Sequence, residues 1–297
     1  MITGDEDTDR FEEHRPRLFG IAYRMLGSAD EAEDTVQDAY LRWRAADRAA
    51  VEHPGAFLAK TVTRLCLNRL DSARARRERY VGPWLPEPVL TSDGTLGPLE
   101  SAEQRDGVSL ALLVLLERLT PVERAVYVLR EAFGYGHREI AGLLELTEAN
   151  CRQLYRRAAQ RVAAPQPRFQ ADPGQWRGLV DTFLSAARDG DVAALERLLA
   201  GDAVYVSDGG GKVGAARRPV YGRDRVARLL AGLLAKYGAG LEFGFAEVNG
   251  APAVLVGAGG QVAGVLVLEV ARGQVAGVRA QVNPDKLGFV QKQLSRS

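Results

Sequence analysis

The stretch His137–Val162, HREIAGLLELTEANCRQLYRRAAQRV, decides how the N-terminal half of this chain is organised. Wound at about 3.6 residues per turn, its second part, Glu148–Val162, divides into two faces. The apolar face carries Cys151, Leu154, Tyr155, Ala158 and Val162. The opposite face carries Glu148, Arg152, Gln153, Arg156 and Arg157, with Asn150 and Arg161 at its edges. This pattern predicts an amphipathic helix whose outer face is rich in arginine and amide groups.

A second, shorter helix is predicted just before it. Apolar residues recur over Ile140–Leu144, and Glu145–Thr147 connects this segment to the longer helix, with Thr147 placed as its N-cap. Two helices joined by a tight turn form a helix-turn-helix, whose second helix lies in a DNA major groove. The alternative is an ordinary helical hairpin with a solvated basic face, and the rest of the chain has to decide between the two.

Composition limits the classes of protein to consider. The chain has 297 residues, 46% of them hydrophobic and 26% charged, which is typical of a globular protein of two or three domains. Its 39 Lys and Arg nearly balance 38 Asp and Glu, so a nucleic-acid binder of this composition must separate its charges locally. The acidic N-terminus and the lack of long apolar runs predict no signal peptide and no membrane span.

The cysteine and histidine positions predict neither disulfides nor a metal site. Only Cys66 and Cys151 are present, far apart on predicted helices, which fits a reducing cytoplasm. None of the three histidines is spaced from either cysteine as metal ligands would be. We therefore expect a cytoplasmic protein without a metal ion or other cofactor.

The first 80 residues predict three helices after a short disordered acidic lead at residues 1–10. Helices are expected at Phe11–Met25 and Ala29–Ala46, and a third from Ala56 to about Arg79. The second exposes a row of acidic residues, which is either a solvated face or a docking surface for a basic partner. The third exposes Lys60, Arg64 and Asn68 at a spacing of four residues and ends in an arginine-rich run. Such a surface suits binding to the phosphates and bases of a nucleic acid. The alternative is a solvated helix end whose positive charges only complement the helix dipole.

Residues 81–107 predict a linker, because three prolines within a few residues exclude a helix. Its tryptophan and leucine suggest that it packs against another part of the chain. Helices follow at Val108–Leu119 and from Thr120, where Thr-Pro-Val-Glu supplies a cap. The part from Gly174 onward predicts two helices, a strand at Ala203–Ser207, a helix at Arg223–Tyr237 and an antiparallel meander of four strands. This order indicates an α+β sheet curled over helices, a shape that commonly encloses a pocket.

Together these segments resemble an extracytoplasmic-function (ECF) sigma factor of bacterial RNA polymerase. The resemblance rests on the stretches AEDTVQDAYLRW, AFLAKTVTRLCLNRL, LTPVERAVYVLRE and HREIAGLLELTEANCRQLYRRA. It implies a region 2 domain at residues 8–80 and a region 4 domain at 108–164, both helical, with a linker at 81–107. The α+β part, residues 174–297, resembles a SnoaL-like domain, and the whole chain is similar to the sigma-J-type group.

The resemblance also implies partners and roles for individual residues. The face expected to bind the polymerase consists of Glu33, Asp34, Gln37, Asp38 and Leu41. The resemblance implies contacts with the clamp helices and flap of core RNA polymerase. The residues expected to bind the melted minus-ten promoter element are Lys60, Arg64, Asn68 and Arg69. Those expected to read the minus-thirty-five element are Glu148, Asn150, Arg152, Gln153, Arg156 and Arg157.

Three motifs link the chain to the sigma-J-type group, in which the fused domain is thought to modulate the sigma factor. They are WLPEP (Trp84, Leu85, Pro86, Glu87, Pro88), DGGGK (Asp208, Gly209, Gly210, Gly211, Lys212) and NPDKL (Asn283, Pro284, Asp285, Lys286, Leu287). The glycine spacing of DGGGK is not that of a phosphate-binding loop. We expect instead a contact loop whose Asp208 and Lys212 pair with region 2 or with the linker, the alternative being a plain flexible loop. Asn283 is expected to cap the final helix.

The sequence therefore predicts a non-enzymatic transcription initiation factor that is regulated in cis by its C-terminal domain. One alternative is that the C-terminal domain is an enzyme or a sensor of an unknown small ligand. Residues 174–297 contain no histidine, which disfavours an enzyme. The other alternative is a DNA-binding regulator that never engages polymerase.

Overall fold

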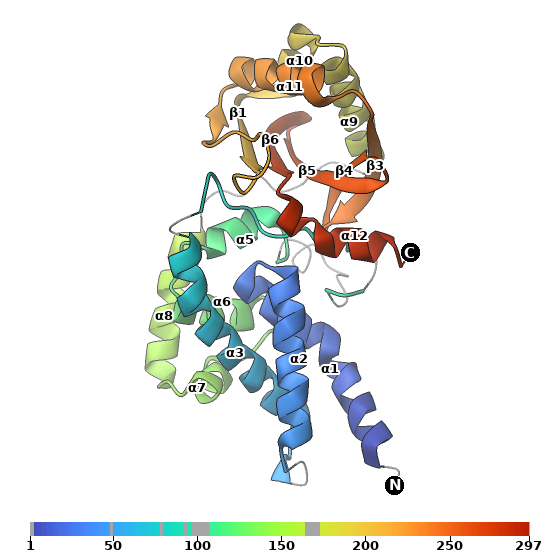
Figure 1. Cartoon of the computed structure of the whole chain (residues 1–297). Helices are drawn as coiled ribbons and strands as arrows, with labels where there is room; N and C mark the ends of the chain where they lie inside the picture. Colours follow the sequence, from blue (N-terminus) through green and yellow to red (C-terminus); the bar gives the residue numbers. More distant parts are fainter. Residues whose placement is uncertain are drawn as a thin grey trace. The chain divides into compact units, whose positions relative to one another are not determined.

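A computed structural model describes residues 3–47, 50–77, 80–91, 94–96, 107–163 and 173–296 (Figure 1). The chain divides into two compact units. The first comprises Met1–Arg79 and Thr91–Ala164, and the second comprises Tyr80–Leu90 and Pro165–Ser297. Residues 81–90 of the predicted linker, together with Tyr80, thus belong to the second unit, although the residues directly before and after them belong to the first.

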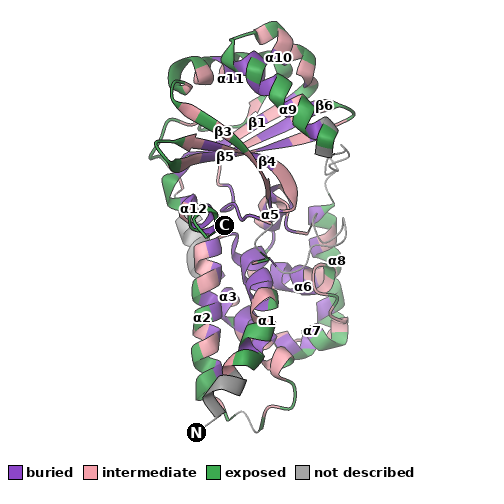
Figure 2. Cartoon of the chain, turned by 90° about the vertical axis from the view of Figure 1, so that its right-hand side faces the viewer, coloured by how far each residue is buried: buried purple, intermediate pink, exposed green. Residues whose placement is uncertain are grey.

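The described part of the first unit is helical. Its helices are α1 (Thr3–Leu26), α2 (Ala29–Ala45), α3 (Pro54–Arg77), α5 (Leu110–Leu116), α6 (Pro121–Glu131), α7 (His137–Leu144) and α8 (Glu148–Val162). The expectation of a disordered lead is wrong, because α1 already begins at Thr3. Acidic residues suit the first turns of a helix, and the Thr8 hydroxyl lies 3.4 Å from that of Tyr40 on α2. Trp43, Tyr23, Phe11 and Phe19 are buried in this unit. Figure 2 shows the buried parts of its helices in purple.

The helix boundaries follow the capping signals in the sequence. The Ser28 hydroxyl accepts a hydrogen bond from the Glu31 N–H at 3.1 Å. Thr120 and Glu123 form a reciprocal capping box at the start of α6. The Thr147 hydroxyl accepts the Asn150 N–H at 3.2 Å and starts α8. The predicted N-caps of α6 and α8 are therefore confirmed.

The second unit contains the helices α9 (Pro173–Arg188), α10 (Val192–Leu198), α11 (Arg223–Tyr237) and α12 (Gly288–Leu294), with a short 3-10 helix, η2, at Pro284–Lys286. Its strands are β1 (Leu199–Asp208), β2 (Val220–Tyr221), β3 (Leu241–Val248), β4 (Ala251–Ala258), β5 (Gln261–Ala271) and β6 (Gln274–Gln281). They form one sheet in the order β2-β1-β6-β5-β4-β3.

The predicted meander is confirmed, since β3 to β6 pair antiparallel in sequence order. Two features differ from the sequence-based expectation. Strand β1 begins at Leu199, ahead of the predicted start at Ala203, and it pairs in parallel with β6, with Tyr205 opposite Val278. The short edge strand β2 was not expected, because two residues give no periodicity to detect.

The two faces of the sheet are covered differently, with α9–α11 on one side and α12 on the other (Figure 1). Trp176, Phe183, Tyr205 and Leu268 belong to the apolar cluster between the helices and the sheet. On the side of α12 the extended linker segment contributes Leu85, Val89 and Leu90, all buried. As the sequence indicated, this linker packs against the protein.

The linker is also joined to the second unit through its backbone. The Val89 carbonyl accepts the Asn249 N–H at 2.9 Å, and the Val89 N–H donates to Asn249 Oδ1 at 3.1 Å. The Leu90 N–H donates to Gln293 Oε1 of α12 at 2.9 Å. These bonds satisfy backbone groups that an extended buried segment would otherwise leave unpaired. Among the described helices, none has the length and apolar character needed to cross a bilayer.

Candidate functional site

The helix-turn-helix is formed by α7 and α8. Glu145 ends α7 in a left-handed conformation, with φ 59°, and Thr147 begins α8. Cys151, Leu154, Ala158 and Val162 are buried, which confirms the predicted apolar face of α8. Tyr155 is anchored to α6, because its hydroxyl donates to Glu131 Oε1 at 2.7 Å.

The outer face of α8 contains two groups of side chains. Those of the first group pair within the unit: Arg152 with Glu148 at 2.5 Å, and Arg157 with Glu123 of α6 at 3.9 Å. Glu123 also accepts from Arg161 at 2.5 Å. The second group is exposed and has no side-chain partner among the described residues; it consists of Asn150, Gln153 and Arg156. The second group is thus the part of α8 that is available to a ligand.

The polar row on α3 faces the turn of the helix-turn-helix. Arg64 Nη2 forms an ion pair with Glu145 Oε1, and Lys60 Nζ lies 3.5 Å from the same oxygen. Asn68 is exposed. Arg69 points elsewhere, because its guanidinium pairs with Asp38 of α2 at 2.7 Å. The side chains of the arginine run from Arg74 to Arg79 lie outside the described residues.

The acidic face of α2 is partly occupied by basic neighbours. Glu33 accepts a hydrogen bond from Arg15 of α1 at 2.7 Å, and Asp34 lies 4.0 Å from Arg69. Gln37 is exposed, and Leu41 is 55% exposed although it is apolar. An exposed leucine beside exposed carboxylates has the composition of a protein-binding surface.

Two buried arginines join α1–α3 to α5–α8 inside the first unit. Arg24 Nε donates to the Gly107 carbonyl at 3.0 Å, and its guanidinium lies 5.2 Å from the centre of the Phe133 ring. Arg124 Nη1 donates to the Met25 carbonyl at 2.7 Å. Burial lowers the pKa of Arg24 to about 10 and that of Arg124 to about 9. The first unit therefore contains buried charges where its two sets of helices meet, a contact surface that we call the seam.

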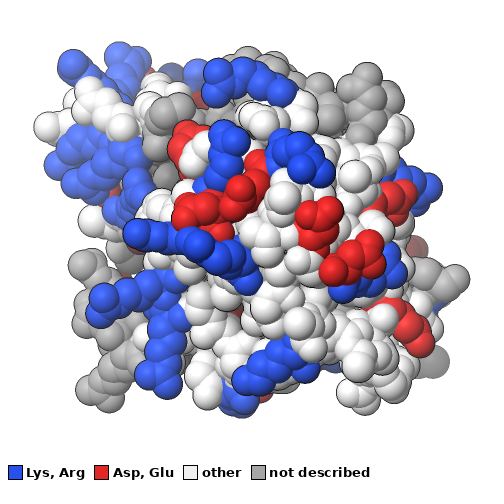
Figure 3. Space-filling view, turned by 90° about the horizontal axis from the view of Figure 1, so that it is seen from above, with Lys and Arg blue, Asp and Glu red and all other residues white. Residues whose placement is uncertain are grey.

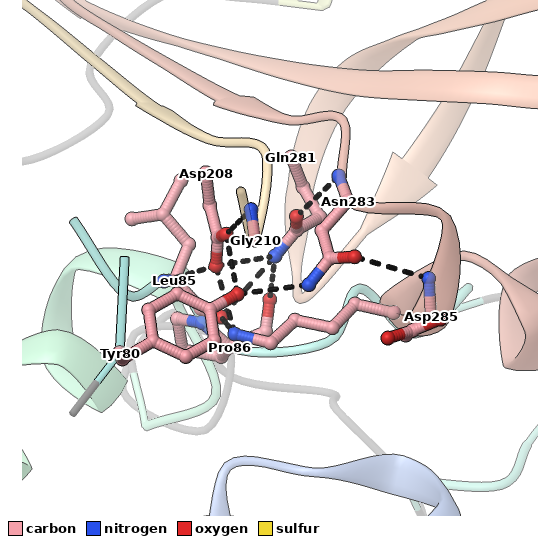
Figure 4. A network of polar contacts seen from close by, with 9 residues as sticks. Tyr80, Leu85, Pro86, Asp208, Gly210, Gln281, Asn283 and Asp285 are labelled. Carbon is pink, nitrogen blue, oxygen red and sulfur yellow. Dashed lines mark hydrogen bonds and ion pairs between the residues drawn. The ribbon is translucent and has the colours of Figure 1, made fainter. Parts of the chain in front are cut away.

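The motifs WLPEP, DGGGK and NPDKL come together in the second unit (Figure 4). Asp208 is fully buried and accepts hydrogen bonds from the Leu85 N–H at 2.8 Å and from Lys286 Nζ at 2.7 Å. It also accepts the Tyr80 hydroxyl at 2.6 Å. Lys286 donates in addition to the Leu85 carbonyl at 2.8 Å and lies over the ring of Trp84. One carboxylate and one ammonium thus hold the linker, β1 and η2 together.

The three glycines allow this close packing. Gly210 has φ 59°, and a Cβ atom built on it would fall 2.3 Å from Asn283 Nδ2. Gly209 is similarly restricted, since its Cβ would lie 2.7 Å from that of Ala215. Asn283 accepts the Asp285 N–H at 3.1 Å and so caps η2. It was expected to cap the final helix, but α12 begins after Leu287 instead. Lys212 was expected to pair with region 2 or the linker, and it pairs instead with Asp285 at 2.6 Å.

Several residues of these sites escaped the sequence analysis. Tyr80 and Gln281 lie outside the three motifs, yet Gln281 Nε2 donates to the carbonyls of Leu85 and Pro86 at 3.2 and 3.1 Å. Glu145 was treated only as part of a turn. A buried glutamine in a β-strand and a lone acidic residue in a turn have no pattern that distinguishes them in a single sequence.

The second unit also carries unassigned basic side chains near the start of α11. Arg217, Arg218, Arg223 and Arg225 are exposed, while Arg228 pairs with Asp224 at 2.7 Å. Figure 3 shows Lys and Arg gathered towards one side of the face seen from above, with Asp and Glu towards its middle. No group of three or more His, Cys, Asp and Glu side chains in the described ranges is placed to hold a metal ion.

Comparison with known proteins shows which family the chain belongs to. Residues 10–76 match the model of Sigma-70 region 2, and residues 109–162 match that of Sigma-70 region 4. The chain is 37% identical over 291 residues to the ECF RNA polymerase sigma factor SigJ of Mycobacterium tuberculosis, covering 94% of this chain and 93% of that protein. It is 33% identical over 297 residues to the probable ECF RNA polymerase sigma factor SigI of the same species, covering 99% of each.

A solved structure agrees with these matches. The crystal structure of Mycobacterium tuberculosis SigJ superposes with a TM-score of 0.75 at 32% identity, covering 95% of this chain and 98% of that one. The resemblance inferred from the sequence motifs is therefore confirmed. With helical regions 2 and 4 followed by an α+β domain, the chain belongs to the family of ECF RNA polymerase sigma factors.

Proposed function

We propose that this protein binds core RNA polymerase and directs it to start transcription at promoters with two recognised elements. The observation that carries the proposal is that matched regions 2 and 4 each present an exposed polar helix face. On α8 this face includes Asn150, Gln153 and Arg156, and on α3 it includes Arg64 and Asn68. Regions 2 and 4 would then each supply one contact with the promoter.

The chemistry of the two helices suits different forms of DNA. Arginine can donate two hydrogen bonds to guanine O6 and N7 in the major groove, and amides suit adenine, so Arg156, Gln153 and Asn150 fit duplex reading. Lys60, Arg64 and Asn68 fit a separated strand, whose phosphates and exposed base edges they would bind. Arg69 stabilises the contact between α3 and α2 in this structure through its ion pair with Asp38. Arg69 would bind DNA only after this ion pair has broken.

The acidic face of α2 is the proposed docking surface for polymerase. Asp34 and Gln37 are exposed at its centre, and Leu41 adds an apolar contact. Glu33 and Asp38 are already paired with Arg15 and Arg69, so they would add charge more than new hydrogen bonds. Clamp helices and flap of core polymerase are the proposed partners of regions 2 and 4.

Run-off transcription with purified core polymerase tests the main proposal. The wild-type chain should produce transcripts from a promoter selected with it, and co-purification with core enzyme should be lost in Asp34→Ala combined with Gln37→Ala. Glu52→Gln, which removes an exposed charge elsewhere in the first unit, is the matched control. A chain that binds promoter DNA without ever associating with polymerase would be a conventional regulator.

We further propose that the C-terminal domain regulates the sigma regions in cis through the linker. Its support is that Tyr80–Leu90, which connects regions 2 and 4, packs within the second unit. A segment fixed in this way cannot adjust its path freely when the two regions move apart to bind separate promoter elements. Asp208 and Lys286 would then act as the clasp that keeps the linker docked.

Point variants test cis regulation better than truncation, because removing the C-terminal domain would expose the apolar linker. Lys286→Met should release the linker and change transcription in the reconstituted assay by several-fold. Asp224→Asn, which alters an exposed ion pair in the same domain, should not. Equal output from wild-type protein and Lys286→Met, with linker release verified by proteolysis, would remove the idea.

A small-ligand role for the C-terminal domain has one observation in its favour. Glu247 Oε1 is buried and has no hydrogen-bond partner among the described residues. Strand alternation puts Glu247 on the same face of β3 as Phe245, whose ring meets that of Trp176. A ligand that donates a hydrogen bond would satisfy this oxygen. A thermal-shift screen of the wild-type chain against Glu247→Gln checks this, because a ligand bound there raises the melting temperature of the wild type alone.

A further inference from the structure

The turn between α7 and α8 places one carboxylate against the polar residues of α3 that are expected to bind the minus-ten element. We call Lys60, Arg64 and Asn68 the minus-ten row. Glu145 Oε1 lies 3.5 Å from Lys60 Nζ, and it also contacts the guanidinium of Arg64. These are two of the four residues expected to bind the melted promoter strand. The hydrogen bond from Arg64, followed by the charges of Arg64 and Lys60, lowers the pKa of Glu145. Glu145 is therefore ionised at neutral pH and occupies donors that DNA would need.

The backbone of the turn does not account for a glutamate at this position. Glu145 has φ 59°, a left-handed conformation that helix ends usually assign to glycine or asparagine. A glutamate there is conformationally less favourable than glycine. Its side chain is 66% exposed, so it fills no core either. Its described partners, Lys60 and Arg64, are what distinguish this side chain from one that only faces solvent.

We propose that Glu145 is an internal competitor of single-stranded DNA, which keeps the minus-ten row occupied until the promoter strand displaces it. The proposal rests on the assignment of α3 to the minus-ten element. A carboxylate offers charged oxygens to Lys and Arg much as a DNA phosphate does, so both compete for the same donors. Displacement releases Glu145 to water and leaves no buried unpaired charge.

The competition is selective for one of the two DNA-binding surfaces. Asn150, Gln153 and Arg156 on α8 are exposed and have no side-chain partner in the described part of the chain. The duplex-reading face is thus open while Lys60 and Arg64 are engaged. Region 4 would meet duplex DNA first, and region 2 would become available on separation of the two sets of helices.

The seam between these helices suits such a separation. Arg24 and Arg124 are 5% and 3% exposed, and each donates to a backbone carbonyl across the seam. Burying a guanidinium costs solvation free energy that water restores when the seam opens. A seam built only of apolar side chains would have no such compensation on opening.

DNA binding by the full chain tests the role of Glu145. The probes are a fluorescein-labelled, mixed-sequence single strand of about 12 nucleotides and the duplex that it forms with its complement. Glu145→Gln removes the charge, and Glu145→Gly also removes the side chain from a position where glycine is favoured. Both variants should bind the single strand about 2- to 10-fold more tightly than wild type, as expected for losing two exposed ion pairs.

The controls separate this effect from general electrostatics and from misfolding. Glu52→Gln removes an exposed carboxylate that pairs with no described residue, and it should change affinity for both probes equally and slightly. Duplex affinity of the Glu145 variants should match that of Glu52→Gln. The inference is overturned if both Glu145 variants bind the single strand no better than Glu52→Gln does. If the wild-type chain also fails to initiate transcription with core polymerase, the proposed function itself is wrong.

Discussion

Asp208 and Lys286 form an ion pair that is almost entirely removed from water, with Nζ 2.7 Å from Oδ2 and the side chains 0% and 10% exposed. Around this pair the structure gathers the linker, the glycine loop and the N-cap of η2. Buried ions of this kind are stable only when each has its full set of partners. Here Asp208 accepts the N–H groups of Leu85 and Gly210 as well, and Lys286 donates to the Leu85 carbonyl.

Removing one partner of this pair should destabilise the second unit strongly. Asp208→Ala leaves Lys286 charged and buried, and Lys286→Ala does the same to Asp208, so each should cost about 3–5 kcal/mol. The double variant Asp208→Leu with Lys286→Met should cost less than either single change, because it leaves no isolated charge. Denaturant unfolding of the full chain measures the three values. Additive costs would show that the two charges do not depend on each other.

The same variants should release the linker. Leu85 and Val89 are buried, so a docked linker resists proteases, whereas an undocked one exposes the chain around Pro86. Limited proteolysis followed by mass spectrometry should therefore show faster cleavage within residues 80–90 in Lys286→Ala than in Asp224→Asn. Unchanged cleavage would mean that the linker is held by Val89, Leu90 and their partners alone.

Two glycines with the same backbone conformation allow the packing of the loop to be tested. Gly210 and Gly259 have φ 59° and 58°, but only at Gly210 would a Cβ atom meet a neighbour, Asn283. Gly259→Ala should cost about 1 kcal/mol for the left-handed backbone. Gly210→Ala should cost about 1–3 kcal/mol more because of the overlap. Thermal unfolding of the two variants compares them, and equal shifts would contradict the close approach.

The pKa of Glu145 gives a measure of its contact with α3 in solution. Since Arg64 and Lys60 lower this pKa from the ordinary value of 4.5, the contact is fully formed above that value and is lost as the pH falls through the lowered pKa. The carboxyl 13C resonance of Glu145 should therefore titrate below 4.5 in the wild type. It should move upward in Arg64→Ala, and a titration unaffected by Arg64 would place the carboxylate away from α3.

Local signals in the sequence were sufficient for most of the helices. Thr120-Pro121-Val122-Glu123 and Thr147 mark helix starts through hydrogen bonds made within a few residues, so they can be read without the fold. The meander was equally readable, because its turns have their own residue preferences. The parallel pairing of β1 with β6 joins segments far apart in the chain, and no local pattern in either segment indicates which strand it pairs with.

The sites were predictable only where a motif or a helix face carried them. Asp208 and Lys286 belong to motifs, yet their pairing with each other comes from folding. Arg24 and Arg124 look like surface residues in the sequence, and their burial depends on backbone carbonyls contributed by distant segments. Arg69 stands beside Asn68 in sequence, but one residue along a helix turns a side chain by about 100°, towards α2.

The last prediction concerns how duplex DNA is read by Asn150, Gln153 and Arg156, the exposed α8 side chains without a side-chain partner among the described residues. A preferred duplex is first selected from a random library by the wild-type chain. Arg156→Ala should then weaken binding by about 1–3 kcal/mol and relax preference at one base position if Arg156 contacts a guanine. If Arg156 contacts a phosphate, the affinity for all duplex sequences should fall alike. The salt dependence of binding should then decrease by the contribution of about one phosphate contact. Arg161→Ala is the comparison, since Arg161 is bound to Glu123 within the unit and should not alter base preference. Unchanged affinity and preference in Arg156→Ala would remove α8 from the DNA-reading surface.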